Sequence, residues 1–316
     1  MKKYMFLILL LAAVAVTLLG CGRGQQEAPA AEMDPSAENT ILNDTNVVPA
    51  KDPINFLEYC DGTITLRFSL EEDGAKWVWV DEPTFPLDGT AVEGTITALK
   101  ELGQLQKAPA AEDLEVYGLS DPQKYLTIKS ATTAGTIFIG EQAEDGSWFS
   151  AIEGYEEVFV LPDAFVQLLS RSVYDMAVLP TLPAFTADAL MYIAVESGEN
   201  RTALRMVDGQ WSSTNKNALD RIEEITTTLS SLQVSRCFDF LPSQQALSLT
   251  GFSSPTATIT VEYLNSVGVE SSFSMTLGNL RSAEEGYYVT FNDDSTIYLI
   301  PAAQVSPLLV LLIYAK

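Results

Sequence analysis

Alternating apolar and polar residues recur along most of the chain and predict many short β-strands. Residues 63–70 alternate in this way, and an acidic turn leads from them to a second apolar run at 76–80. A period of two places the apolar side chains on one face of a strand, so this segment is expected to form a hairpin. Residues 189–195 and 201–207 show the same arrangement. Apolar positions three and four apart then predict one helix after each hairpin. The two helical stripes are Val92, Ile96, Leu99 and Leu102, and Leu219, Ile222, Ile225, Leu229 and Leu232.

Polar residues indicate where these helices are expected to begin. Thr90 followed by Glu93 has the spacing of a capping box, and Asn217 is the expected N-cap of the second helix. A shorter stripe closes each half of the chain. The second of these, residues 305–314, is apolar on nearly every side, but ten residues are too few to span a bilayer. We therefore expect it to be buried between the two halves or against a partner. The first short stripe consists of Phe165, Leu168, Leu169 and Val173.

Two parts of the sequence repeat one another. Residues 109–122 align without gaps with residues 242–255, and Gly118 and Gly251 in these segments are 133 residues apart. An ordered series of further matches at similar spacing predicts an internal duplication. The further pairs are Trp79 with Trp211, Gly140 with Gly278 (138 residues apart), and Leu161-Pro162 with Ile300-Pro301.

The duplication and the strand pattern together predict the fold class. We expect an α+β fold, built from two copies of an antiparallel β-sheet with one longer and one short helix in each copy. The first copy is expected to occupy residues 58–180 and the second residues 181–316, with Pro180 and Pro183 marking the joint.

The N-terminal segment has the pattern of an export signal. Two lysines precede an apolar run at residues 5–19, which is shorter than the roughly 20 residues that a membrane-spanning helix needs. A small residue before Cys21 is typical of a lipoprotein signal peptide; the other interpretation is a transmembrane anchor that ends in a cysteine. We predict that residues 1–20 are a lipoprotein signal peptide and that lipid is attached to Cys21. Residues 21–57 are then a disordered tether that holds the protein on the extracytoplasmic face of the cell membrane.

Composition limits the chemistry. The chain has 18 Lys and Arg against 42 Asp and Glu, and the net charge of −24 argues against a nucleic-acid partner. The sequence has no histidine, which excludes Ser–His and Cys–His catalytic pairs and His-ligated zinc. Cys60 and Cys237 are expected to be two buried thiols, although an exported compartment also permits a disulfide between them. No cofactor is predicted.

Candidate sites are few. Ser213 and Lys216 have the spacing of a serine–lysine pair, but they lie in an expected helix-entry loop and lack the companion motif. The side chains of residues 292–294 could supply oxygen ligands to calcium. The usual sequence pattern of a calcium-binding loop is missing there, however, so no metal site is predicted. Most of the aromatic residues that could stack on a sugar or peptide occupy strand positions that a core would also use. The aromatic residues that we single out as ligand or partner contacts are Trp148, Tyr155, Tyr287 and Tyr288.

Several of these segments resemble the bacterial family called domain of unknown function 4340. The resemblance lies in residues 117–122, 137–140 and 158–162, and in residues 287–289 and 297–301 of the second copy. It implies that relatives are often lipoproteins and that some are linked to ABC-type export systems; it names no catalytic group. We therefore expect a non-enzymatic binding or assembly module accessory to a membrane complex such as an ABC-type transporter. The alternative is a small-ligand or cell-wall-binding lipoprotein with a groove between the two units.

Overall fold

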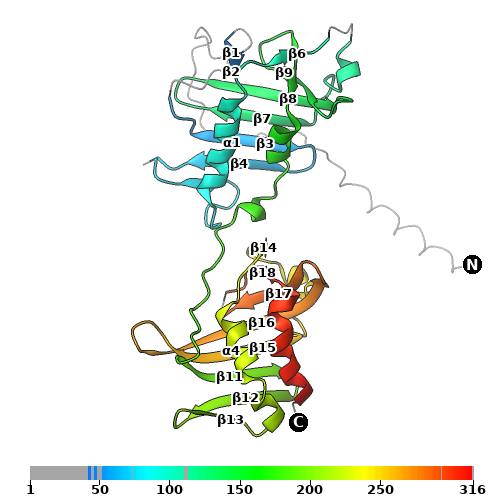
Figure 1. Cartoon of the computed structure of the whole chain (residues 1–316). Helices are drawn as coiled ribbons and strands as arrows, with labels where there is room; N and C mark the ends of the chain where they lie inside the picture. The colour runs from blue at the N-terminus through cyan, green and yellow to red at the C-terminus, as the bar shows by residue number, and fades with distance from the viewer. Residues whose placement is uncertain are drawn as a thin grey trace, which may run out of the picture. The chain divides into compact units, whose positions relative to one another are not determined.

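A computed structural model describes residues 42–43, 46–47, 52–72, 74–109, 113–292 and 294–314. The expected signal peptide, the lipidation residue Cys21 and most of the expected tether lie outside these residues. The described chain contains two eight-stranded antiparallel sheets and a small pair of strands, β1 (Leu42–Asn43) and β2 (Asn46–Val47) (Figure 1). The structure therefore has the α+β character and the two sheets that the sequence predicts.

The strands of the first sheet are arranged in the order β5-β4-β3-β7-β8-β9-β10-β6. Sequence neighbours are mostly neighbours in the sheet, whereas β6 crosses to the far edge and pairs with β10. The strands are β3 (Phe56–Asp61), β4 (Thr65–Leu70), β5 (Trp77–Trp79), β6 (Gln106–Lys107), β7 (Lys124–Lys129), β8 (Ala134–Gln142), β9 (Trp148–Ile152) and β10 (Val158–Leu161).

The second sheet has the order β13-β12-β11-β15-β16-β17-β18-β14. When the strands are numbered from the start of each sheet, this order is the same as that of the first sheet, including the crossing of the fourth strand to the far edge. Two sheets of identical order suggest the internal duplication. The strands are β11 (Leu190–Ser197), β12 (Asn200–Val207), β13 (Gln210–Ser212), β14 (Arg236–Asp239), β15 (Ala257–Leu264), β16 (Glu270–Ser282), β17 (Gly286–Phe291) and β18 (Ile297–Ile300).

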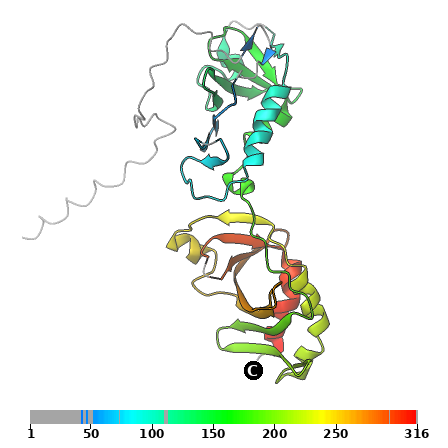
Figure 2. The same ribbon diagram turned by 90° about the vertical axis from the view of Figure 1, so that its left-hand side faces the viewer.

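Helix α1 (Gly89–Glu101) lies against one face of the first sheet (Figures 1 and 2). The helix buries Val92, Ile96 and Leu99, as its apolar stripe predicts. Its expected cap is wrong: the helix already begins at Gly89, and the Asp88 carboxylate accepts hydrogen bonds from the Thr90 backbone N–H at 3.0 Å and from the Thr90 hydroxyl at 2.7 Å. The aspartate competes successfully because its charge favours a helix N-terminus. The other helical segments are η1 (Leu114–Tyr117), α2 (Asp163–Leu168) and η2 (Val173–Met176).

The long helix expected in the second half is interrupted. It forms as α3 (Lys216–Leu219) and α4 (Ile222–Ser230), and the cap is Asn215, which accepts from the backbone N–H of Asn217 at 3.0 Å. The expected cap at Asn217 is therefore wrong, and the observed cap lies two residues earlier in the chain. Polar Asp220 and Arg221 stand between the two segments, and Arg221 leaves helical geometry with ψ near 1°. Helix α5 (Gln244–Leu249) follows β14.

The apolar C-terminal segment forms α6 (Ala302–Leu309) and η3 (Val310–Tyr314). It does not need a partner to be buried, because it packs on its own sheet and on α4 (Figure 2). Val305, Leu308 and Leu311 are fully buried there, and the backbone carbonyl of Leu311 accepts a 2.8 Å hydrogen bond from the Thr202 hydroxyl on β12. This corrects the expectation that the segment lies between the two halves or against another protein.

The chain folds into two compact units. The first contains the described residues up to Ala75 and Val92–Ser170, and the second contains Lys76–Ala91 and Arg171 onward. Residues 76–91 thus group with the second unit, in which the Phe85 ring meets Tyr174 and Phe240 at centroid distances of 5.9 and 5.5 Å.

The repeated glycines of the first unit serve a close approach between a turn and a strand. Gly118 has a left-handed backbone (φ +67°) and ends η1, and a Cβ there would lie 2.5 Å from Glu141 Cγ. A Cβ at Gly140 would lie 2.1 Å from the Tyr117 carbonyl oxygen. Only glycine leaves room at either position. The ladder between β8 and β9 shifts register between Ile139 and Gln142, so the turn packs against a bulge that includes Gly140.

The second unit repeats this packing with different side chains. Gly251 has φ +96°, and a Cβ there would lie 2.5 Å from Asn279 Oδ1. A Cβ at Gly278 would lie 2.2 Å from the Thr250 carbonyl oxygen, and the β16–β17 ladder also shifts register after residue 277. The sequence motif therefore encodes the same turn-on-bulge packing in both sheets.

Cys60 and Cys237 are free and fully buried. This confirms that they act as small apolar side chains and not as a disulfide.

Candidate functional site

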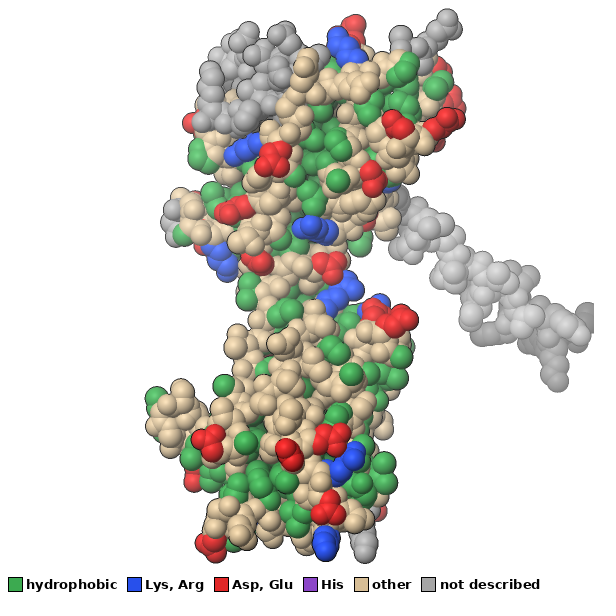
Figure 3. All heavy atoms as spheres, in the orientation of Figure 1, with side chains coloured by type: hydrophobic (Ala, Val, Ile, Leu, Met, Phe, Trp, Pro, Cys, Tyr) green, Lys and Arg blue, Asp and Glu red, His purple; other side chains and the backbone are tan. Residues whose placement is uncertain are grey.

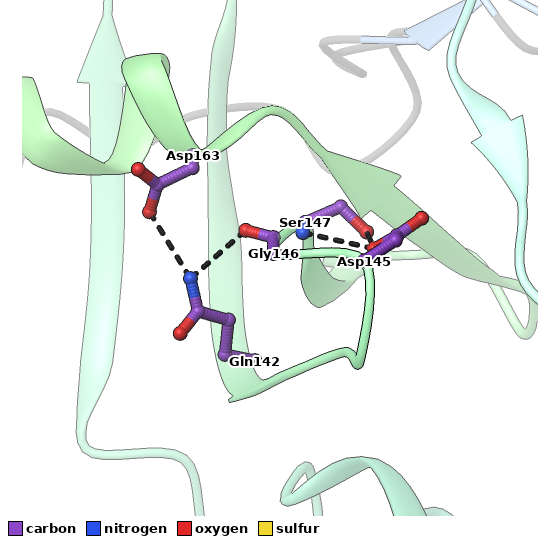
Figure 4. A pocket seen from close by; sticks show the side chains of 5 residues that line it. All are labelled: Gln142, Asp145, Gly146, Ser147 and Asp163. Atoms are coloured by element: carbon purple, nitrogen blue, oxygen red, sulfur yellow. Dashed lines mark hydrogen bonds between the residues drawn. The ribbon is translucent and has the colours of Figure 1, made fainter.

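A shallow depression opens beside the β8–β9 turn in the first unit (Figure 4). Its volume is about 400 Å³, and polar residues line it: Gln142, Asp145, Gly146, Ser147 and Asp163. Gln142 lies between the turn and α2, and its side-chain amide donates to the Gly146 carbonyl oxygen at 2.9 Å and to Asp163 Oδ1 at 3.3 Å. The two carboxylates can accept hydrogen bonds from a ligand rich in hydroxyl or amino groups.

Trp148 stands next to this depression at the start of β9. Its indole N–H donates to Asp163 Oδ1 at 2.8 Å, and the ammonium of Lys124 lies 4.1 Å from the centroid of its ring. Asp163 Oδ1 also accepts from the Gln167 amide at 3.3 Å. A carboxylate therefore orients the edge of the tryptophan, and a cation covers one face of its ring. We call Lys124, Gln142, Trp148 and Asp163 the Trp148 cluster.

The turn that borders the depression is ordered by its own side chains. Asp145 Oδ1 accepts from the Ser147 hydroxyl at 2.5 Å and from the Ser147 backbone N–H at 3.0 Å. These hydrogen bonds lower the pKa of Asp145 below its usual value because they favour the charged form, and the bond from the Ser147 hydroxyl has the larger effect. Asp145 is therefore charged at neutral pH.

The structure does not bring the four selected aromatic residues together. Tyr155 follows the other end of β9 and forms an edge contact with Phe159, 6.5 Å between centroids. Tyr287 and Tyr288 lie next to each other on β17, so their side chains point to opposite faces of the second sheet. Tyr288 packs on Phe238 at 4.7 Å. Trp148 and Tyr288 are thus held in separate contacts, one in each unit.

Sequence reasoning selected Trp148 but missed the residues that hold it. The second sheet places Leu280 opposite Tyr287, as the first places Gln142 opposite Trp148. At the spacing of the repeat, Asp163 corresponds to Ala302 and Lys124 to Ala257. The polar partners therefore exist in one copy alone. A comparison of the two copies, position by position, would have found them.

One thiol and two phenols in the described residues have pKa values raised toward the neutral form. Burial raises the pKa of Cys237 to about 12, and burial likewise raises the pKa of Tyr298 to about 12, with nearby Asp294 adding to the effect. On the first sheet, burial and a 2.9 Å hydrogen bond to Glu58 raise the pKa of Tyr125 to about 12. A thiol or phenol with a raised pKa is a weaker nucleophile at neutral pH, which is opposite to the shift that catalysis requires.

The described residues contain no group of three or more acidic or cysteine side chains placed to hold a metal ion. Asp293 of the Asn292–Asp294 segment lies outside them. Within the same ranges, no helix combines the length and the apolar character needed to cross a membrane.

Comparison with known proteins identifies the family. Residues 77–255 match the family described as Domain of unknown function (DUF4340), and this range is more than half of the chain. The chain belongs to this family. No curated protein matches it, and no solved structure does.

Proposed function

We propose that this protein is a lipid-anchored extracytoplasmic binding or assembly module, without enzymatic activity, that is accessory to a membrane complex such as an ABC-type transporter. Cys21 carries the lipid, and the tether that follows gives the two folded units reach above the membrane. The two units are copies of one ancestral unit with a longer and a short helix each, which the identical strand order supports.

The observation that carries the proposal is that both sheets fill their own cores. The central side chains of the helix-covered face of the second sheet, Ile193, Ile259 and Met275, are fully buried by the unit's own residues. The same is true of Phe68 and Phe159 in the first sheet. A fold whose interior is packed in this way recognises other molecules with its outer surfaces, as scaffold and assembly proteins do.

The charge of the chain supports an assembly role away from the lipid surface. A net charge of −24 is repelled by an anionic leaflet, so the folded units gain nothing electrostatically from lying on the bilayer. They remain free to meet a partner within the reach of the tether.

Replacement of the anchor residue tests the proposal. Cys21→Ser should move the protein from the membrane fraction to the soluble extracytoplasmic fraction, whereas Ser36→Ala in the tether should leave it with the membrane. Mass spectrometry of the intact wild-type protein should show a diacylglyceryl modification on Cys21. Unchanged membrane retention of Cys21→Ser would contradict the lipid anchor.

A second candidate function is supported by the depression beside the Trp148 cluster. Its carboxylates and the neighbouring indole are groups that bind sugars and amino sugars of the cell wall. A thermal-shift screen of the soluble protein with wall fragments distinguishes the two functions, because a ligand that binds the folded state raises the melting temperature by mass action. A shift that disappears in Trp148→Ala and Asp163→Ala would favour the ligand-binding function.

A further inference from the structure

The β15–β16 hairpin of the second unit is longer than its counterpart in the first. Lys129 pairs with Ala134 in the β7–β8 hairpin, and at the spacing of the repeat this pair corresponds to Glu262 and Ser272. The β15–β16 ladder continues beyond that point by two more pairs, Tyr263 with Ser271 and Leu264 with Glu270. The hairpin therefore extends past the end of the shared fold (Figure 1).

The end of this hairpin exposes aliphatic side chains. Val267 is 78% exposed, Val269 57% and Leu264 38%. We call residues 264–269 the apolar tip. Figure 3 shows the hairpin as a projection from the second unit with hydrophobic side chains toward its end. The equivalent loop of the first unit, residues 130–133, contains a serine, an alanine and two threonines. The apolar tip is thus a property of the second copy and not of the fold.

Local hydrogen bonds hold the apolar tip in one conformation. The Asn265 side-chain oxygen accepts from the backbone N–H groups of Val267 at 3.1 Å and of Val269 at 3.0 Å. The Gly268 N–H donates to the Asn265 carbonyl oxygen at 2.8 Å, and Gly268 itself adopts φ +76°. Such a turn holds its side chains in one arrangement, which lowers the entropy cost of binding. These hydrogen bonds use the backbone of Val267 and Val269, so the exposed valine side chains play no part in holding the turn.

Charge decides between the molecules that could cover this tip. Residues 263–269 carry no charged side chain, and the nearest charges along the chain are the carboxylates of Glu262 and Glu270. Glu262 lies 4.0 Å from the guanidinium of Arg205, so Glu270 is the carboxylate that gives the tip its negative border. A basic group on or beside the tip would be needed for attraction to an anionic bilayer, and a second copy of this chain would bring the same carboxylates and another net charge of −24. The anionic bilayer and a second copy of the chain are therefore both repelled by the negative charge of this protein. A protein with an apolar hollow and a basic rim complements the tip in shape and charge.

We propose that the apolar tip docks into an apolar hollow bordered by Lys or Arg on the extracytoplasmic part of a partner protein. This inference rests on the proposed function, because the partner is taken to be part of the membrane complex. The aliphatic side chains supply the buried contact at the centre of the interface, and Glu270 meets the basic rim.

Site-specific photo-crosslinking in intact cells tests the inference with the full-length, membrane-anchored chain. A benzophenone amino acid at Val267 should yield one discrete adduct with a different protein. The same probe at Ala131, in the equivalent hairpin of the first unit, should yield none. Adding Leu264→Ser and Val269→Ser to the Val267 probe should lower the adduct at least tenfold, and Glu270→Lys should lower it several-fold while Glu270→Gln has a smaller effect.

Unfolding of the variants is excluded by a separate measurement. The four side chains that these variants change, Leu264, Val267, Val269 and Glu270, are exposed, so the melting temperature should stay within a few degrees of the wild type. An adduct with lipid, an adduct of two copies of this chain, no adduct, or an adduct that the tip substitutions leave unchanged would each overturn the inference. Cross-linking through other residues and the Cys21→Ser fractionation would still report on the proposed function, so the two failures are distinguishable.

Discussion

Replacing Gly140 with alanine tests the physical reason for the repeated sequence motif. The added Cβ would lie 2.1 Å from the Tyr117 carbonyl oxygen and 3.0 Å from Leu119 Cγ. The Tyr117 carbonyl cannot move away easily, because hydrogen bonds hold the two following residues at the end of η1. The Gly118 N–H donates to the Glu115 carbonyl and the Leu119 N–H to the Leu114 carbonyl, each at 3.0 Å. The clash must therefore be relieved by moving backbone.

The size of the effect follows from this geometry. Inserting a methyl group into a packed site costs typically 1–3 kcal/mol, and a backbone neighbour places Gly140→Ala toward the upper end, at about 2–3 kcal/mol of the free energy of unfolding. Gly94→Ala is the matched control, since it lies inside α1 with nothing within 4 Å of the added Cβ. It should stabilise the protein by roughly 0.5–1 kcal/mol, because alanine favours a helix more than glycine does.

Urea unfolding of the soluble chain gives the two free energies, and hydrogen exchange measured by mass spectrometry locates the change. Gly140→Ala should accelerate exchange in β7–β9 and leave the second sheet unaffected. Gly278→Ala, whose Cβ would lie 2.2 Å from the Thr250 carbonyl oxygen, should do the same to β15–β17. Equal effects of Gly140→Ala and Gly94→Ala, within about 0.5 kcal/mol, would refute the argument that close approach requires the glycine.

Further predictions concern single groups. Asp163→Ala should lower the free energy of unfolding by about 1–2 kcal/mol and change the Trp148 fluorescence, because the indole N–H loses its charged acceptor, whereas exposed Asp121→Ala should do neither. The folded pKa of Tyr298 is raised to about 12 from an ordinary value of 10, so its contribution to stability is full below pH 10 and is lost as the pH rises through 12. Urea midpoints of Tyr298→Phe should accordingly fall less steeply than those of the wild type between pH 10 and 12, and parallel curves would contradict this. The thiol of Cys237 should react with a disulfide reagent at pH 8 only after urea is added, and rapid reaction of the folded protein would show that the thiol is accessible.

Much of the fold is predictable because it depends on local patterns. Alternation marks the strands, and the spacing of Val92, Ile96 and Leu99 marks the buried side of α1. The strand order within each sheet is less accessible to sequence reasoning, because the pairing of β6 with β10 joins residues about 50 positions apart. The helix caps differ from the expectation for a related reason: two or three polar residues near each helix start can cap it, and Asp88 and Asn215 are better placed than Thr90 and Asn217.

The candidate site is less predictable than the fold. Trp148 can be selected from the sequence because it is a tryptophan beside an expected turn. Its partners Lys124 and Asp163 lie on other elements, and the local sequence around neither of them indicates a contact with the indole. The apolar tip has the opposite problem, because Val267 and Val269 read as ordinary strand residues. Their exposure becomes visible only when the two hairpins are compared at the same register.

Cross-linking in intact cells, followed by identification of linked peptides, tests the central claim most directly. With a reagent that joins carboxylates to lysines, the described units should be linked to extracytoplasmic residues of an integral membrane protein, and Cys21→Ser should abolish those links. A monomer without any linked membrane protein, under several linker lengths, would contradict the account of this chain as a tethered assembly module.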